Sequence, residues 1–325
     1  MELLTNMAAC RMSDIIYQHV PVLLNEAVAA LLTSPHGVYV DATFGRGSHT
    51  QAILNQLSKE GRLIAFDKDP EAVAYARQHF SHDKRFSIFH RSFAELQVSL
   101  MELALFGKVN GILFDLGVSS PQLDNPARGF SFTRDGKLDM RMDNSQGIDA
   151  MTFIAKVDEV ELADILWKYG EEKYSRRIAK AIVMKRVEQP ITTTAQLADI
   201  IKFAIPKSKT QPLKHPATRS FQAIRIAINQ ELTELEQALD QALEALMLGG
   251  RLSLISFHSL EDRIVKQFFR LHEKGEDLPR GLPVKGRRFN ARLKSLGKAI
   301  KPNLNEMNIN PRARSAILRI AEKVS

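Results

Sequence analysis

The sequence predicts an α/β fold in which a doubly wound parallel sheet is interrupted by an all-helical segment. Short apolar runs alternate with helical stretches up to Leu116, and such alternation is typical of parallel sheets. Strand-like runs then stop and return only at Arg251. We therefore expect one sheet formed by two separated parts of the chain, with helices between them.

The first part of the sheet is predicted from four apolar runs. They are Val38–Ala42, Arg62–Phe66, Phe86–His90 and Gly111–Leu116. Helices are predicted between them, at Asp69–His79 and Phe93–Leu105. Asp69 followed by Pro70 indicates a helix start, with the aspartate as N-cap and the proline at the first helical position.

The chain then changes character. Residues 117–147 are rich in Gly, Ser, Pro, Asp and Arg, which predicts a loop, and residues 148–205 have only helical periodicity. Pro206, Pro212 and Pro216 mark a linker. An apolar stripe over Ala217–Leu248 predicts one long core-packed helix that Gly249-Gly250 ends.

Strand signals return in the last quarter of the chain. We expect strands at Arg251–Phe257 and Ser315–Ile320, with a helix at Leu260–Leu271 between them. The predicted organisation is an N-terminal flexible extension (1–18), a first part of the α/β domain (19–121), a helical insert (122–216) and a second part of the α/β domain (217–325).

The composition limits where the protein works and what it binds. Its 325 residues include a single cysteine, Cys10, which excludes an internal disulfide framework and a cysteine-based zinc site and suits a cytoplasmic location. No apolar run reaches the roughly 18 residues of a membrane-spanning helix. The formal net charge is +8. Lys168–Arg225 and Pro279–Lys301 concentrate the basic residues, which favours contacts with nucleic-acid phosphates.

A glycine turn after the first strand is the strongest functional signal. Gly45 and Gly47 follow an apolar run, a helix follows them, and Asp67 closes the next strand. This order is typical of a nucleotide-type cofactor site, where the acid accepts hydrogen bonds from a ribose diol. Thr50 replaces the third glycine of a dinucleotide site. Asp41 before the turn suits the cationic amino group of S-adenosylmethionine.

A second candidate site follows the fourth strand. Asp115 stands at the strand's carboxyl end, where open α/β sheets bind their ligands, and the turn to Gln122 follows it. This segment resembles the loop of enzymes that methylate exocyclic amino groups. There Asp115 and a loop carbonyl accept hydrogen bonds from the amine. Ser119 is either a substrate contact or part of a solvated turn.

Two further segments have alternative interpretations. Phe130 and Phe132 either stack on a flipped base or anchor their loop on the core. His258 either touches the substrate or orients its loop, and Ser259 with Asp262 is read as a helix-capping box. A Ser-His-Asp triad stays open, although the Gly-x-Ser-x-Gly elbow is missing. The spacing around His215 and His258 predicts no metal site.

Together these segments identify the chain as similar to the ribosomal RNA small subunit methyltransferase H family, the 16S rRNA N4-methylcytidine methyltransferases. The resemblance runs from His19 to Ser315, nearly the whole chain. Its specific segments are Phe44–Gly47, Asp115–Gln122, Arg128–Phe132, Leu138–Asp143, Tyr169–Glu172, His215–Phe221, Ser256–Arg263 and Asn310–Ser315.

The resemblance implies a Rossmann-like class I S-adenosylmethionine-dependent methyltransferase sheet with a helical substrate-recognition insert. It also implies S-adenosylmethionine as donor and the N4 atom of a cytidine in the decoding region of small-subunit rRNA as acceptor, with the rRNA or small ribosomal subunit as partner. The implied cofactor contacts are Gly45, Gly47, Ser48, His49, Asp67, Phe93, Asp115 and Gln122.

One position departs from the family pattern. Ser48 stands where the family usually has glycine, and a backbone contact there persists only if the φ angle of Ser48 is negative. Two other functions are weighed: a non-catalytic RNA-binding ribosome-assembly factor, and a nicotinamide-dependent oxidoreductase. The intact Asp67 and Asp115 disfavour the first, and Thr50 disfavours the second.

Overall fold

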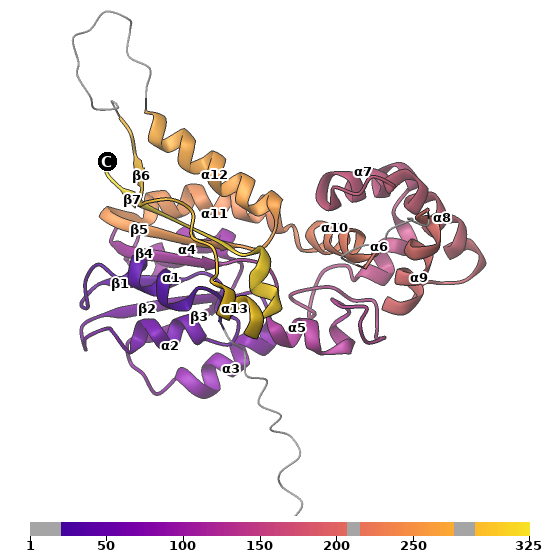
Figure 1. The fold of residues 1–325 in the computed structure, drawn as a ribbon. Coiled ribbons are helices and arrows are strands. Elements are labelled where there is room, and N and C mark those ends of the chain that lie inside the picture. Colours follow the sequence, from indigo (N-terminus) through magenta and orange to yellow (C-terminus); the bar gives the residue numbers. More distant parts are fainter. Residues whose placement is uncertain (1–20, 207–214, 276–289) are drawn as a thin grey trace, which may run out of the picture.

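The computed structural model describes residues 21–206, 215–275 and 290–325. The predicted extension, residues 1–18, and much of the second basic stretch lie outside these residues. The described part forms a sheet with helices on both faces, and a group of helices beside it (Figure 1). Within those ranges, no helix combines the length and the apolar character needed to cross a membrane.

Seven strands form one sheet in the order β3-β2-β1-β4-β5-β7-β6. The first five in this order are parallel, while β7 runs antiparallel to both β5 and β6. The bounds are β1 (Val38–Asp41), β2 (Arg62–Asp67), β3 (Phe86–His90), β4 (Val109–Asp115), β5 (Leu246–Ser256), β6 (Leu293–Ser295) and β7 (Ile317–Lys323). The predicted α/β fold class with an interrupted parallel sheet is confirmed.

Helices cover both faces of the sheet (Figure 1). Apolar side chains alternate along each strand, so neighbours such as Tyr39 and Val40 enter different cores. One core is closed by α1 (Leu24–Leu31), α2 (Ser48–Leu54) and α3 (Pro70–Phe80). The other is closed by α4 (Leu96–Glu102), α11 (Glu231–Ala245) and α12 (Ser259–Lys274).

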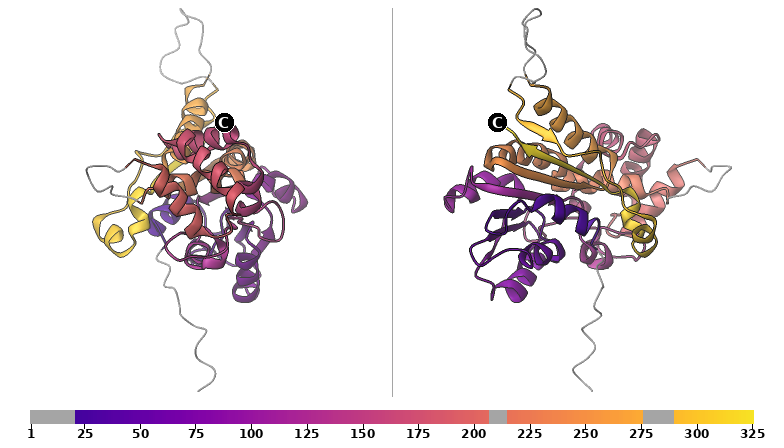
Figure 2. Two further views of the ribbon diagram at one scale, coloured as in Figure 1. Left: turned by 90° about the vertical axis from the view of Figure 1, so that its right-hand side faces the viewer. Right: turned by 60° about the vertical axis from the view of Figure 1, so that its left-hand side comes forward.

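The helical insert has a core of its own and lies at one side of the sheet (Figures 1 and 2). After the short α5 (Ser120–Asp124) come α6 (Ala150–Lys156), α7 (Glu159–Gly170), α8 (Ser175–Glu188), α9 (Thr194–Ala204) and α10 (Thr218–Asn229). The C-terminal part adds α13 (Leu304–Ile309), and single 3₁₀ turns occupy Phe93–Glu95, Pro126–Arg128 and Pro311–Ser315.

The long helix predicted over Ala217–Leu248 is wrong, because the chain bends at Gln230. Gln230 has a φ of 54° and ends α10, and α11 begins at the next residue. The apolar stripe therefore serves two cores: Ile224 packs in the insert, whereas Leu235 packs against the sheet. Through α10, the insert extends to Asn229 rather than to residue 216.

The predicted end of that helix is also wrong. The helix ends at Ala245, and Leu246 already belongs to β5. Gly249 has a φ of 77°, next to an irregularity in the pairing of β4 with β5. The glycine pair therefore accommodates an irregular strand rather than a helix end. The predicted cap of α3 is confirmed, since Asp69 accepts the backbone N–H of Glu71 and Pro70 follows it.

Candidate active site

A cavity of about 340 Å³ lies at the carboxyl ends of β1, β2, β4 and β5. Open α/β sheets bind ligands at this edge. Most of the predicted site residues line the cavity: Gly45, Ser48, His49, Asp67, Phe93, Asp115, Ser119, Gln122 and His258. Side chains from the insert, the β4 loop and the C-terminal segment complete the wall, among them Gln222, Arg225 and Arg312.

The turn between β1 and α2 needs glycine at two positions. Gly45 and Gly47 have φ angles of 57° and 75°. A Cβ atom on Gly47 would lie 2.8 Å from the rings of Phe44 and Phe80, so no other residue fits there. Ser48 begins α2 and does not have a positive φ, which meets the condition for keeping its backbone contact.

Asp67 at the end of β2 is held by two backbone groups. Gly45 donates its N–H to Oδ2 at 2.7 Å, and Asp69 donates its N–H to Oδ1 at 2.8 Å. Burial raises the pKa of this carboxyl to about 6, against the effect of these hydrogen bonds. The turn and the acid are thus one unit, in which the glycine loop fixes the side chain that faces the cavity.

Asp41, unlike Gly45 and Asp67, does not line the cavity. Its side chain accepts the hydroxyl of Thr50 at 2.7 Å and the N–H of Thr43 at 3.2 Å. Only 1% of the residue is exposed, and burial raises its pKa to about 6. The expectation that Asp41 holds a cationic amino group is not supported, because its buried side chain accepts hydrogen bonds from Thr43 and Thr50 instead.

Asp115 is the buried acid of the cavity. Its backbone N–H is fixed by Thr43 Oγ1 at 2.7 Å, and Oδ2 lies 3.5 Å from His49 Nδ1. Oδ1 is buried and accepts no hydrogen bond from the residues that the structure describes. Burial, followed by the charges of Asp41 and Glu261, raises the pKa of Asp115 well above its usual value. A ligand group that donates a hydrogen bond to Oδ1 would favour the ionised carboxylate and so offset this shift.

The loop after β4 is ordered by its own side chains. Gln122 Oε1 accepts the N–H of Ser119 at 2.9 Å, and the Ser119 side chain caps the helix in return. Gln122 Nε2 donates to Asp69 Oδ2 at 2.9 Å. Ser119 is therefore a capping residue as well as part of the cavity wall.

His258 caps α12, so the predicted capping box is shifted by one residue. Its Nδ1 accepts the N–H of Glu261 at 3.4 Å, and Glu261 Oε2 accepts the N–H of His258 at 3.2 Å. Asp262 instead binds Arg319 with both oxygens, at 2.7 and 3.0 Å. Ser259 donates to Glu171 at 3.1 Å. Since Asp262 and Ser259 have other partners, the Ser-His-Asp triad is not assembled.

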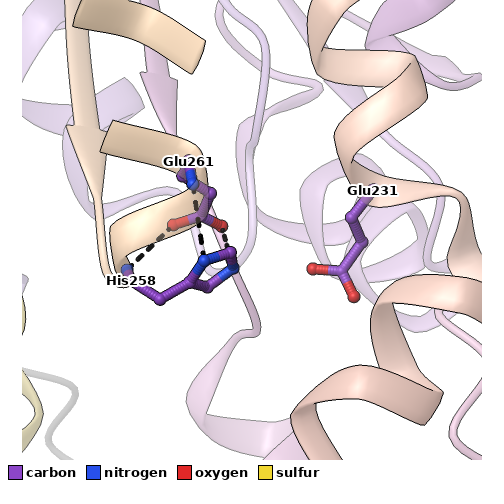
Figure 3. A group of neighbouring side chains, drawn as sticks. All are labelled: Glu231, His258 and Glu261. Carbon is purple, nitrogen blue, oxygen red and sulfur yellow. Dashed lines mark hydrogen bonds and ion pairs between the residues drawn. The ribbon is translucent and has the colours of Figure 1, made fainter. Parts of the chain in front are cut away.

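Glu231, His258 and Glu261 approach one another beside the cavity (Figure 3). Their potential ligand atoms lie within 4.8 Å of one another, so the fold gives His258 acidic neighbours that its sequence spacing did not indicate. The carboxylate of Glu231, however, receives two hydrogen bonds from Arg225, both 2.8 Å long. Arg225 and the cap formed by His258 and Glu261 thus make this group a polar network at the end of α10 and the starts of α11 and α12.

Phe130 and Phe132 anchor their loop rather than face the cavity. Phe130 is buried, with the guanidinium of Arg128 5.8 Å from its ring centroid. Phe132 packs edge-on against Phe221 of α10, with ring centroids 4.8 Å apart. Neither ring lines the cavity, so the structure favours the core-anchoring interpretation over base stacking.

Comparison with known proteins identifies the family. The sequence model of the MraW methylase family matches residues 16–324. The chain belongs to the MraW methylase family. It is 54% identical over 308 residues to a protein of Legionella pneumophila (strain Paris) named ribosomal RNA small subunit methyltransferase H, covering 95% of this chain and 99% of that protein.

A second MraW relative carries the same name. The protein of Pseudoalteromonas atlantica is 54% identical over 309 residues, covering 94% of this chain and 98% of that one. Among solved structures, an rRNA methylase of Streptococcus thermophilus has a TM-score of 0.41 at 13% identity, over 93% of this chain and 94% of that one. The resemblance read from the sequence is confirmed, and this MraW methylase is a methyltransferase.

Proposed function

We propose that the protein methylates the N4 amino group of a cytidine in the decoding region of 16S rRNA, with S-adenosylmethionine as donor. The observation that carries this proposal is the buried Oδ1 atom of Asp115, which accepts no hydrogen bond from the described residues. It lies in a cavity that the glycine turn and Asp67, the predicted ribose-binding acid, also line. The names of the relatives support the rRNA substrate.

The residues present fit the cofactor. When bound, S-adenosylmethionine supplies a methyl group activated by a sulfonium. The carboxylate of Asp67 would accept hydrogen bonds from the ribose hydroxyls, and the backbone of Gly45–His49 would lie against the donor. Phe93 follows β3 and gives the cavity an apolar wall for a purine ring. Gln122 would contact the cofactor through the polar side-chain atoms that stay accessible beside its hydrogen bonds to Ser119 and Asp69.

Asp115 would orient the amine. The N4 lone pair of cytosine is delocalised into the ring, so the amine is a weak nucleophile. A hydrogen bond from N4–H to Asp115 Oδ1 would localise that lone pair and fix its direction, and holding two reactants in place supplies a large part of a rate enhancement. His49 beside Asp115 would fix the carboxylate. Ser119 and His258 stay predictions as contacts of the base.

The insert would bind the RNA backbone. On and just before α8, exposed basic residues form a group that none of the described ion pairs includes. These residues are Lys173, Arg176, Arg177 and Lys180. Such cations are suited to phosphate contacts. A cytoplasmic location and independence from metal ions also stay predictions.

Methyl transfer to small ribosomal subunits lacking this modification tests the proposal. We expect the purified protein to transfer labelled methyl groups from S-adenosylmethionine, and nucleoside analysis to find N4-methylcytidine. A protein that binds subunits without methylating them would instead support the alternative, a non-catalytic assembly factor. Methylation at another atom or base would contradict the assignment of the acceptor.

A further inference from the structure

A chain of hydrogen bonds leads from Asp67 to the helical insert. Asp69 donates its N–H to Asp67. The Oδ2 atom of Asp69 accepts Nη1 of Arg128 at 2.8 Å and Nε2 of Gln122 at 2.9 Å. The side chains of Arg128 and Asp69 are only 4% and 5% exposed. This ion pair is therefore shielded from water and directly adjoins the predicted ribose-binding acid.

The other side of the Arg128 guanidinium holds a loop of the insert. Its Nη2 donates to the carbonyl oxygens of Arg141 at 3.1 Å and Met142 at 2.7 Å. The carbonyl of Arg128 accepts the N–H of Met140 at 2.9 Å. Met142 itself lines the cavity. One planar cation thus fixes both the neighbour of Asp67 and a second part of the cavity wall.

The same loop is tied to α10. Asn229 accepts the N–H of Met142 at 2.7 Å and donates to the carbonyl of Met140 at 2.8 Å. Lys68, next to Asp67 in sequence, donates to the carbonyl of Asn229 at 3.1 Å. The end of α10 therefore contacts the turn after β2 directly, through Lys68, and is also linked to it through residues 140–142 and Arg128.

We propose that Arg128 is a positioning residue that couples occupancy of the cofactor site at Asp67 to the placement of the 138–143 loop, so that cofactor and RNA strengthen each other's binding. The inference rests on the proposed function. Arg128 neutralises Asp69, which leaves Asp67 as the carboxylate available for the ribose hydroxyls. A lysine lacks the planar fork that reaches the carboxylate and both carbonyls together.

Coupling of this kind is reciprocal. The factor by which the cofactor raises RNA affinity must equal the factor by which RNA raises cofactor affinity, and typical factors are about 5 to 150. The product S-adenosylhomocysteine and unmethylated small subunits are suitable probes, because no turnover occurs. The dissociation constant of each is measured with the other absent and with it saturating.

Arg128→Gln and Asp69→Asn are the informative variants. We expect the unaltered protein to have a coupling factor within the range above, and each variant to have a factor near one. The double variant should lose nothing further, since both residues act through one pair. Arg186→Gln is the matched control, because Arg186 donates to the carbonyls of Ile154 and Val157 at 2.6 Å within the insert. It should keep the coupling even if it lowers thermal stability.

Hydrogen exchange of the unaltered protein provides a second measurement that needs no variant. Saturating S-adenosylhomocysteine should slow exchange of the amides of Met140 and Met142, and leave those of α9 unchanged. Three outcomes would overturn this inference without touching the proposed function. The first is a coupling factor of one in a protein that methylates subunits, and the second is an Arg128→Gln variant that keeps the coupling of the unaltered protein. The third is hydrogen exchange at Met140 and Met142 that the cofactor product leaves unchanged. A protein that neither binds nor methylates subunits would overturn the proposed function as well.

Discussion

Asp67 receives two backbone hydrogen bonds and still faces the cavity. Hydrogen bonds to a charged group contribute about 1.5–3 kcal/mol each. We therefore expect Asp67→Ala to weaken S-adenosylmethionine binding about tenfold or more, since tenfold corresponds to about 1.4 kcal/mol. Calorimetric titration measures this, with the exposed Asp240→Ala on α11 as control. Equal affinities of both variants would remove Asp67 from the site.

Asp115 is expected to act on turnover more than on RNA binding. Asp115→Ala removes both the acceptor and the charge, whereas Asp115→Asn keeps the shape and one acceptor. We expect a large loss of the single-turnover methylation rate for alanine, an intermediate loss for asparagine, and little change in RNA affinity for either. A normal rate with Asp115→Ala would contradict this role and would indicate that Ser119, His258 or the loop carbonyls orient the amine.

The raised pKa of Asp67 predicts how cofactor binding depends on pH. Burial raises this pKa to about 6, so the free protein keeps a proton on Asp67 at lower pH, and a protonated acid is a poor acceptor for ribose hydroxyls. Affinity for S-adenosylmethionine should rise between about pH 5 and 7 and then level off, with proton release near pH 6. Titration calorimetry in buffers of different ionisation enthalpy measures that release. Asp67→Asn should flatten the rise, and an unchanged profile would contradict this assignment.

The bend between α10 and α11 sets the geometry of one wall of the cavity. Arg225 and Glu231 lie on either side of Gln230, and the bend brings them into contact. The left-handed conformation costs a residue other than glycine roughly 1–2 kcal/mol. We therefore expect Gln230→Gly to raise the free energy of unfolding by about 1 kcal/mol or leave it unchanged.

A matched substitution separates this effect from ordinary helix propensity. Gln237 is exposed in the middle of α11. There Gln237→Gly should lower the free energy of unfolding by up to about 1 kcal/mol. Denaturant unfolding of both variants provides the comparison. Equal destabilisation by the two glycines would show that the bend does not strain Gln230.

Elements with a strong local pattern could be predicted from the sequence. Asp67 and Asp115 were placed correctly because parallel strands bring their carboxyl ends to one edge. The bend at Gln230 was missed since neither glycine nor proline interrupts the apolar period there. The three-residue β6, Leu293–Ser295, is too short to show a period.

Contacts between distant residues account for the rest of the site. Arg128 and Asp69 are 59 residues apart in sequence, and only the folded chain joins them. The packing of Phe132 against Phe221 likewise favours one of two interpretations that the sequence left even, the anchoring of the loop. The family resemblance supplied the predicted cofactor contacts, whereas the ion pairs next to these residues required the structure.

The net charge of the whole molecule predicts a salt-dependent affinity for RNA. Each phosphate neutralised contributes about 0.7 to 0.9 to the slope of log affinity against log salt. Replacing the four cations at α8 by glutamine should lower the magnitude of this slope by about 2.8 to 3.6 if all four contact phosphate. The control replaces the exposed Lys59 and Lys84, which lie just before β2 and β3. A salt-independent affinity would show that the basic residues only solvate the surface.

The position of the insert between β4 and β5 also shapes how the nascent chain folds. At about 5 to 20 residues per second, synthesis reaches Leu246 roughly 7 to 26 seconds after Asp115 has been made. Throughout that interval β4 lacks the neighbour that completes its hydrogen bonding, and open strand edges promote association between chains. The insert has its own core and is complete before β5 emerges. The edge of β4 therefore stays open to pairing with another chain until β5 has been synthesised.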